Sequence, residues 1–452
     1  MMLEGPVLIV ILIGAIGFII FATAIIKLHP FLSLLMATFG VGFIVRMPLM
    51  EIIDAVNRGF GGMMGTIGLI IIFGTIIGTV LEKSGGAITM ADVVLRTLGK
   101  KRPALAMSLI GAIVSIPVFC DSAFVILAKL NKAIARRSQV PLSTMTIALA
   151  SGLYATHTLV PPTPGPIAAA GNLGAANYLG TVIWIGLLTA IPVILVGYWW
   201  ALRVGRTVTI EGEQANGKGS ESPANARPQP SAFKAFTPIV LPVMLIALAS
   251  IVKSLGWNGG LADLTRFIGN PLVALFLGVL VSFRLMPKFD SEHLNGWIGA
   301  AIVQAGPILL ITGTGGAFGS LLKATPLTAL ITGLVGNGQV SGWAFIVIAF
   351  SISAALKSSQ GSSTAALVIT SSLLAPFIGA LGMATPVSMA LVVMAIGSGA
   401  MVVSHVNDSY FWVVSQFSGL TLSDAYRSFT VVTLLQGLTG LVTTLILYSL
   451  LA

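Results

Sequence analysis

The amino-acid sequence predicts an all-α polytopic membrane protein built from two repeats of inverted topology. First, the 452-residue chain is 56% hydrophobic and only 8% charged, whereas a soluble protein carries about 25% charged residues. Second, most apolar segments reach the roughly 20 residues that a helix needs to cross a bilayer. Third, two halves of similar size flank one polar segment. We expect about ten transmembrane helices, two re-entrant hairpins and two broken helices.

The polar segment, residues 207–234, is rich in Gly, Ser, Pro and charged residues, which is typical of a solvated linker. It divides the chain into a first repeat, 1–206, and a second repeat, 235–452. Two pairs of stretches align in the same order in both halves, which favours a true repeat. They are GTIIGTVLEKS (74–84) with GGAFGSLLKAT (315–325) and, more loosely, ASGLYATHTLVPP (150–162) with GSGAMVVSHVNDS (397–409).

Charged flanks predict where the chain turns back within the membrane. Two basic stretches, 95–102 and 128–137, are only about 25 residues apart, and such stretches favour the cytoplasmic side. The segment between them must therefore enter and leave on one side. We predict re-entrant hairpins at about 103–128 and 344–375, and broken helices at about 142–175 and 386–417.

Five spans and one hairpin per repeat invert the second repeat relative to the first. Both termini then lie outside and the linker lies inside. By this arrangement 18 of the 24 Lys and Arg residues are cytoplasmic, five are outside and Lys357 is at a hairpin tip. The positive-inside rule supports this orientation. Inverted repeats with discontinuous helices are the architecture of secondary transporters, which bind substrate near the midplane.

Several other classes of protein are disfavoured. The first apolar segment, 6–26, lacks a basic region and a cleavage-site pattern, so we interpret it as a retained span rather than a signal peptide. A single cysteine, Cys120, excludes an intramolecular disulfide. Four histidines without an HExxH motif argue against a zinc centre. The glycine-rich GTGGAFG (313–319) lacks the ending of a phosphate loop. The net charge of +10 forms no basic face separate from the spans, so no nucleic-acid partner is expected.

Four polar interruptions, one hairpin tip and one broken span in each repeat, predict the functional site. They are 120–122, 156–166, 357–364 and 404–409. In the second of them, four prolines are predicted to break the helix: Pro161, Pro162, Pro164 and Pro166. Unsatisfied backbone is costly in lipid, so these breaks should face a water-accessible site. Freed amides at half-helix N-termini suit a carboxylate, so we expect a small polar anion as substrate.

Three residues are candidates for proton coupling: Asp121, Asp408 and His405. A carboxylate in a low-dielectric site resists ionisation and can carry a proton. The alternative is that each aspartate only caps the half-helix that follows it. The histidines could relay protons or bind substrate, or simply form hydrogen bonds between helices.

Nine residues are candidates for substrate binding. Lys357 suits the substrate's carboxylate, although it could instead neutralise an aspartate or extend to the outer surface. The hydroxyls could equally bond their own helix backbone. The candidates are Ser122, His157, Thr163, Lys357, Ser362, Ser363, Thr364, Asn407 and Ser409.

Four stretches have a familiar pattern: HPFLSLLMATFGVG (29–42), GTIIGTVLEKSGGA (74–87), IPVFCDSAFVIL (116–127) and HTLVPPTPGPIAAAGNLGA (157–175). On these residues the chain resembles the gluconate permease (GntP) family of bacterial inner-membrane proton symporters, and the HxxxPPxPGP run is the most specific part. The resemblance covers nearly the whole chain. It implies kinship with the ion-transporter superfamily, whose members use two opposed hairpins.

The resemblance also bears on individual residues. Asp121 falls where relatives carry Glu or Asp before an apolar run. The gluconate-transporting branch usually has PPHPGP, whereas this chain has Thr163 in place of that histidine. The tripeptide Cys120–Asp121–Ser122 is also more polar than the usual aromatic–acid–valine pattern. These departures concern the substrate rather than the family.

We therefore expect a multi-pass inner-membrane symporter that imports gluconate or a related hydroxylated carboxylate with protons, without a cofactor. Its partners are the organic acid and the bilayer, and a homo-oligomer is left open. The alternatives are a sodium-coupled carboxylate symporter, a D-amino-acid (D-serine-like) symporter and a passive channel. An intramembrane enzyme using Asp121 and Asp408 is the remote alternative, because no GxGD motif is present.

Overall fold

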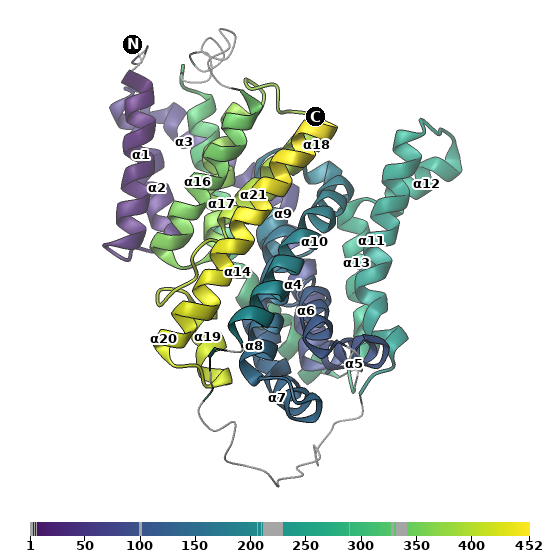
Figure 1. Ribbon diagram of the computed structural model, residues 1–452. Helices are drawn as coiled ribbons and strands as arrows, with labels where there is room; N and C mark the ends of the chain where they lie inside the picture. The colour runs from purple at the N-terminus through teal and green to yellow at the C-terminus, as the bar shows by residue number, and fades with distance from the viewer. Residues whose placement is uncertain are drawn as a thin grey trace.

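The computed structural model describes residues 3, 5, 7–98, 102–205, 207, 208, 210, 229–288, 290–326, 330 and 341–452. All regular structure in this part of the chain is helical, which confirms the predicted all-α class. Figure 1 shows a bundle in which the N- and C-termini lie at the same end. Most of the predicted linker lies outside the described residues.

The N-terminal half begins with three crossings. A hairpin, a broken helix and one long span follow them in that order. α3 and α4 are joined by a π-helical turn, Met64–Gly68, into one continuous rod. The helices are α1 (Val7–Ala24), α2 (Pro30–Ile44), α3 (Leu49–Met63), α4 (Leu69–Lys83), α5 (Gly86–Leu98), α6 (Pro103–Val114), α7 (Cys120–Ser138), α8 (Leu142–Leu159), α9 (Pro164–Asn172) and α10 (Leu179–Val204).

The C-terminal half repeats this order. α12 and α13 are bent by 63° where they meet, in the place that α2 occupies in the first half. The helices are α11 (Ala232–Ser254), α12 (Gly260–Ile268), α13 (Pro271–Ser282), α14 (Ser291–Lys323), α16 (Gly342–Gln360), α17 (Ser363–Leu374), α18 (Pro386–Gly399), α19 (Ser409–Ser418), α20 (Leu422–Ala425) and α21 (Val431–Leu451).

Two helical hairpins, α6–α7 (hairpin 1) and α16–α17 (hairpin 2), enter from opposite ends of the bundle. In Figure 1, α7 lies at the bottom and α16 at the top. Each broken helix packs on the hairpin of the other repeat, because α9 contacts α17 and α19 contacts α7. By length and composition, six of the described helices could cross a membrane, or seven if α12–α13 counts as one span. One of these, α16, is an arm of a hairpin here, so the ten predicted crossings require α1, α2, α8–α9 and α18–α19 to cross as well.

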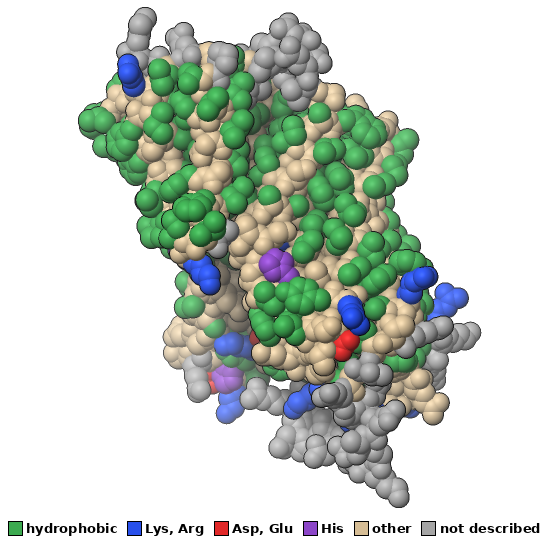
Figure 2. Space-filling view, turned by 60° about the vertical axis from the view of Figure 1, so that its left-hand side comes forward, with side chains coloured by type: hydrophobic (Ala, Val, Ile, Leu, Met, Phe, Trp, Pro, Cys, Tyr) green, Lys and Arg blue, Asp and Glu red, His purple; other side chains and the backbone are tan. Residues whose placement is uncertain are grey.

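Exposed side chains agree with a membrane environment. Large apolar side chains, Trp184, Leu195 and Val303 among them, are exposed on the outside of the bundle. Figure 2 shows hydrophobic side chains over the middle of one face and most Lys and Arg side chains toward the lower end. A hydrocarbon environment covers such apolar surface, and the basic end fits the predicted cytoplasmic side.

The first break is formed by fewer prolines than predicted. Only Pro161 and Pro162 lie between α8 and α9, joined by a cis peptide bond. Pro164 and Pro166 lie in the first turn of α9, where the missing N–H has no intrahelical partner to lose. Pro161 and Pro162 also line an apolar pocket together with Pro238 and Pro242 of α11.

Helix α4 holds the first hairpin tip and the first break together. A side chain at Gly78 would collide with the Pro117 carbonyl in the tip, and a Cβ at Gly74 would lie 2.7 Å from the Pro162 carbonyl oxygen in the break. Only glycine permits helix and backbone to approach this closely. The first hairpin tip and the first break are therefore both packed against helix α4.

Candidate functional site

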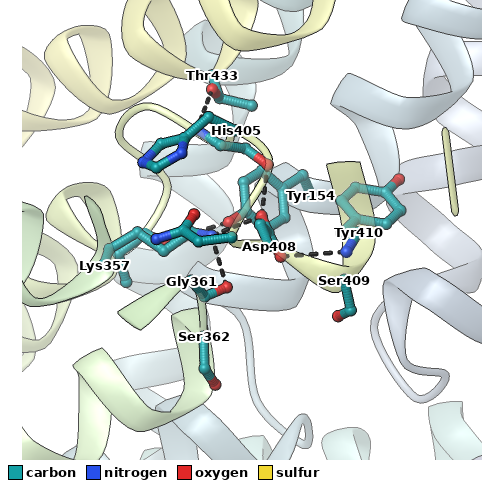
Figure 3. Close-up of polar contacts among 12 residues, drawn as sticks. Tyr154, Lys357, Gly361, Ser362, His405, Asp408, Ser409, Tyr410 and Thr433 are labelled. Carbon is teal, nitrogen blue, oxygen red and sulfur yellow. Dashed lines mark hydrogen bonds and ion pairs between the residues drawn. The ribbon is translucent and has the colours of Figure 1, made fainter. Parts of the chain in front are cut away.

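The polar residues of the second repeat form one bonded cluster around an ion pair (Figure 3). Lys357 Nζ lies 2.5 Å from Asp408 Oδ2, and the two side chains are 0% and 6% exposed. The ammonium also donates to the Gly361 carbonyl at 2.9 Å and lies 5.9 Å from the ring centre of Tyr154. We call Lys357, Ser404 and Asp408 the second-repeat cluster.

Asp408 caps the half-helix that follows it, which was the alternative to proton coupling, and it is also the partner of Lys357 in an ion pair. It is the N-cap of α19, and its Oδ1 accepts from the Tyr410 N–H at 3.1 Å. Its Oδ2 accepts from the hydroxyl of Ser404 as well as from Lys357. Lys357 thus neutralises Asp408. Its ammonium group is not available to pair directly with a ligand. A buried pair of this kind requires additional hydrogen bonds to offset desolvation, and both partners have them.

His405 and Asn407 join the second break to the tip of hairpin 2. His405 Nε2 and Asn407 Nδ2 donate to the same Ser358 carbonyl oxygen, at 2.9 and 2.8 Å. Gly361 has a φ of +79°, and its Cα is packed on the Asn407 carbonyl. The tip therefore needs glycine both for its conformation and for its contact.

The polar residues of the first repeat are incompletely bonded. Asp121 lies in the first turn of α7, and its Oδ2 accepts a long hydrogen bond of 3.4 Å from the Ser409 hydroxyl. Its Oδ1 is buried and has no hydrogen-bond partner among the described residues. His157 is 4% exposed, and its Nδ1 likewise has none within that part of the chain. We call Asp121 and His157 the first-repeat cluster.

The two clusters meet at the start of α19. The Ser409 hydroxyl donates a hydrogen bond to Asp121, and the residue before Ser409 in the chain is Asp408 of the ion pair. Ser409 is exposed, as is Ser362 at the start of α17. In Figure 3 the hydroxyls of Ser362 and Ser409 point the same way, away from the ion pair. The structure thus brings both predicted aspartates and Lys357 to one place.

The remaining candidates occupy varied surroundings. Thr163 is 1% exposed, and its hydroxyl donates to the Val160 carbonyl at 2.7 Å, so it stabilises the break itself. Ser362 caps α17, accepting from the Ala365 N–H at 3.2 Å. Ser363 is buried in the first turn of α17. Thr364 lies where α17 passes Gly165 of α9.

The four half-helices of the site differ at their N-termini. α17 and α19 are capped by the side chains of Ser362 and Asp408. The N-caps of α7 and α9 are Phe119 and Thr163, and neither makes a side-chain capping bond within the described structure. The positive end of α7 is therefore the one left for a ligand, because Pro164 and Pro166 remove two of the N-terminal amides of α9.

Sequence reasoning missed three polar residues of this region. Gln360, at the end of α16, has both amide atoms buried and no hydrogen-bond partner in the described part of the chain. Glu82 is half-buried in the last turn of α4. Asn172 Nδ2 lies within 3.1 Å of Ser371 Oγ, Ser372 Oγ and the Val368 carbonyl on α17. Gln360 lies within the polar interruption 357–364, whereas Glu82 and Asn172 follow apolar stretches, which is a signal that could have identified them.

The chemistry of these groups suits a polar anion. Among the described residues, no group of three or more His, Cys, Asp or Glu side chains could hold a metal ion. Helix N-termini, hydroxyls and amides can bind a carboxylate and hydroxyls, and an unpaired carboxyl group can take up a proton.

Comparison with known proteins gives a consistent picture. A family profile described as GntP family permease matches residues 6–451. The chain is 32% identical to a gluconate permease of Pseudomonas aeruginosa, over 96% of each chain. It is 30% identical to the D-serine transporter DsdX of Escherichia coli, over 93% of this chain and 94% of the relative. The YdaH transporter of Alcanivorax borkumensis has the same fold, with a TM-score of 0.62 at 14% identity, over 89% of this chain and 88% of that one.

Proposed function

This chain belongs to the GntP family of permeases, and we propose that it imports a small hydroxylated carboxylate together with protons. It is a multi-pass transport protein of the bacterial inner membrane and not an enzyme. Its relatives make it a permease of the gluconate type. What we propose beyond this is the identity of the coupling ion and of the substrate.

The contrast between Asp121 and Asp408 carries the proposal. Asp408 is neutralised by Lys357 and solvated by Ser404 and the first turn of α19. Asp121 has one weak hydrogen bond and a buried oxygen without a partner in the described structure. An ionised carboxylate is costly in such a place unless it is paired. Asp121 is therefore the proton carrier, and Asp408 and His405 hold the second break on hairpin 2.

Substrate recognition follows from the uncapped helix ends. The free amides at the start of α7 can bind the carboxylate, whereas Pro164 and Pro166 leave only the Gly165 amide at the start of α9. Because Lys357 is paired with Asp408, it organises the hairpin tip rather than forming a direct ion pair with the substrate. The exposed hydroxyls of Ser362 and Ser409 suit substrate hydroxyls. Ser122, Ser363, Thr364 and Asn407 line the same tips and breaks.

The test is uptake into proteoliposomes under a pH gradient or a sodium gradient. We expect the pH gradient to drive accumulation of gluconate or a smaller hydroxy acid. The Asp121→Asn variant should lose this accumulation by at least about a hundredfold, the scale of a lost acid–base group. Accumulation driven by sodium alone, or an Asp121→Asn variant with the wild-type pH response, would refute proton coupling through Asp121.

The D-serine-like alternative is favoured by one relative, DsdX. A counterflow screen with hydroxy, keto and amino acids, D-serine included, separates the two classes of substrate. An ammonium group on the substrate would need a carboxylate partner, and Asp121, the group nearest to that role, is neutral when it carries the proton. We therefore expect D-serine to compete only weakly with a hydroxy acid, and stronger competition by D-serine would favour the alternative.

A further inference from the structure

Ser404 lies in the middle of the second break, where the chain between α18 and α19 is not helical. Main-chain polar groups in such a segment lack helical partners, and leaving them unsatisfied at membrane depth is costly. Both groups of Ser404 are satisfied by the last helical rod of the chain. Its N–H donates to Thr433 Oγ1 at 3.0 Å (Figure 3), and its carbonyl accepts from Thr430 Oγ1 at 2.6 Å. We call Thr430 and Thr433 the threonine clamp.

The threonine clamp belongs to an unusual part of that rod. α20 and α21 are joined by a π-helical turn, Tyr426–Thr430, so Thr430 ends the turn. Such turns are rare and occur mostly at functional sites. The turn is also held from its other side, because the Ser428 carbonyl accepts from Trp200 Nε1 of α10 at 3.0 Å. Thr433 is 0% exposed, and its hydroxyl donates to the Thr430 carbonyl at 2.8 Å while it accepts from Ser404.

The backbone next to the threonine clamp is strained. Val403 has a φ of +53°, in the left-handed region that a β-branched residue rarely adopts. A conformation of this kind persists only where its surroundings over-determine it. The clamp holds the next residue, Ser404, and a side chain at Gly437 of α21 would collide with Val402. The last helix therefore imposes the shape of the second break.

Ser404 connects the threonine clamp to the ion pair. Its hydroxyl donates to Asp408 Oδ2, and Asp408 caps α19. The first residue of α19 is Ser409, whose exposed hydroxyl donates to Asp121. Because both main-chain groups of Ser404 are held, the direction of its side chain toward Asp408 is held as well. The contacts thus run from α21 through Ser404 and Asp408 to the start of α19.

The first break is approached differently by α10, the long last helix of its repeat. There a side chain at Gly186 would collide with the Leu159 carbonyl, so α10 and the backbone before the break are in direct contact. In the alignment of the two repeats the position of Ser404 is taken by His157, whose Nδ1 has no partner among the described residues. The clamp is therefore a feature of the second repeat.

We propose that Thr430 and Thr433 are positioning residues for the substrate. They hold Ser404 so that its hydroxyl stays on Asp408, and Asp408 keeps the start of α19, with the Ser409 hydroxyl, in its binding position. The clamp acts on the substrate through Ser404 and not by contact. This role rests on the proposed binding of a hydroxylated carboxylate beside Ser409.

The experiment measures the Kd of radiolabelled gluconate, or of the tightest-binding acid of the counterflow screen, on purified protein. Thr433→Val replaces the hydroxyl by a methyl group and leaves the Ser404 N–H without its acceptor. We expect the Kd to rise at least about fivefold, the scale of one lost hydrogen bond. Thr430→Val should have a smaller effect, because a main-chain carbonyl tolerates the loss of a donor better than a buried N–H tolerates the loss of its only acceptor.

Two further variants serve as controls. Thr433→Ser keeps the hydroxyl and should bind as the wild type does. Thr444→Val is the matched control on the same helix. Thr444 is also 0% exposed, and its hydroxyl donates to the Gly440 carbonyl of its own helix at 2.7 Å. Its replacement should leave the Kd unchanged.

A Ser404→Ala background separates positioning from general stability. This substitution removes the hydroxyl on Asp408 and leaves both main-chain groups on the threonine clamp. We expect Ser404→Ala to raise the Kd about as much as Thr433→Val does, and the double variant to bind no more weakly than Ser404→Ala alone, as for residues that act through one contact. The melting temperature should still fall when Thr433→Val is added, because the Ser404 N–H is then unsatisfied.

Two results would overturn the proposal. One is an unchanged Kd in both Thr433→Val and Thr430→Val. The other is a rise in Kd by the same factor with and without Ser404→Ala, which would show that the clamp acts on the fold as a whole. If Thr433→Val does not fold, Thr430→Val in the same two backgrounds carries the test. Failure of the proposed function would appear in the wild type, as no binding of any acid in the screen, so the two failures are separable.

Discussion

Each repeat contributes one hairpin and one broken helix to the same site, but the polar side chains on these elements differ between the repeats. In the second repeat, Lys357, Ser404 and Asp408 satisfy one another. In the first repeat, Asp121 Oδ1 and His157 Nδ1 are buried without partners among the described residues. Backbone symmetry has thus been kept while the side-chain chemistry has diverged. One repeat supplies a fixed anchor, and the other supplies groups that are free to react.

The energetics make this division informative. Leaving a buried polar group unsatisfied costs about 1–3 kcal/mol, and packing alone gives no reason to keep such groups. Asp121 at the tip of hairpin 1 and His157 beside the first break are such groups, as is Gln360 at the tip of hairpin 2, so we expect a ligand or a proton to complete them. The following predictions test this comparison.

The largest expected effect is a loss of stability when the Lys357–Asp408 ion pair is broken. Replacing Lys357 by Met leaves Asp408 charged, buried and unpaired, which should cost about 3–5 kcal/mol of stability. Asp408→Asn should be similarly damaging because it isolates Lys357. The double variant Lys357→Met/Asp408→Asn removes both charges and should recover most of the loss. Thermal melting of purified protein measures all three, with Lys83→Met as an exposed-lysine control. Additive losses in the double variant would show that the pair is not coupled.

A smaller effect is expected for Gln360, whose buried amide has no partner in the described structure. Gln360→Leu should leave melting unchanged or raise it, because the unsatisfied amide is removed. If substrate hydroxyls satisfy that amide, affinity should fall about tenfold, which corresponds to about 1.4 kcal/mol. Binding of a hydroxy acid and of its deoxy analogue should be measured together. A loss that is equal for both compounds would mean that Gln360 does not read a hydroxyl.

Asn172 should have a modest effect on stability. Its amide joins α9 to Ser371 and Ser372 of α17, so Asn172→Ala should cost about 1 kcal/mol for the lost hydrogen bonds. The double variant Ser371→Ala/Ser372→Ala should cost a similar amount, and combining all three changes should add little. Melting curves of the set give the coupling. Strict additivity would contradict a shared hydrogen-bond cluster.

The smallest effect on stability is expected for Asp121→Asn, in contrast to its large effect on uptake. The change removes a weakly bonded carboxylate without isolating a partner charge, so stability should shift by less than about 0.5 kcal/mol. Beside the losses expected for Asp408→Asn, this is the most direct measure of the difference between the repeats. Equal destabilisation by the two substitutions would remove the distinction.

The sequence predicted the positions of the hairpin tips and breaks because polar residues and prolines are unfavourable inside an apolar span unless the helix is interrupted there. It could not predict which polar groups pair. Lys357 and Asp408 are separated by 51 residues, and only the packing of hairpin 2 against the second break shows that they satisfy each other. Tyr154 gave no signal, because a tyrosine in an apolar helix is ordinary. Gln360 and Asp121 differ from their neighbours in lacking partners within the described structure, and a sequence alone does not reveal such a difference.

Cys120 begins α7 beside Asp121, is 3% exposed, and is the single cysteine of the chain. The native protein therefore carries its own chemical reporter at the first hairpin, with no background thiols to remove. A thiol reagent can reach this sulfur only when the hairpin separates from its neighbours. The rate of alkylation, followed by intact mass with and without bound acid, would time that separation in the unmodified transporter.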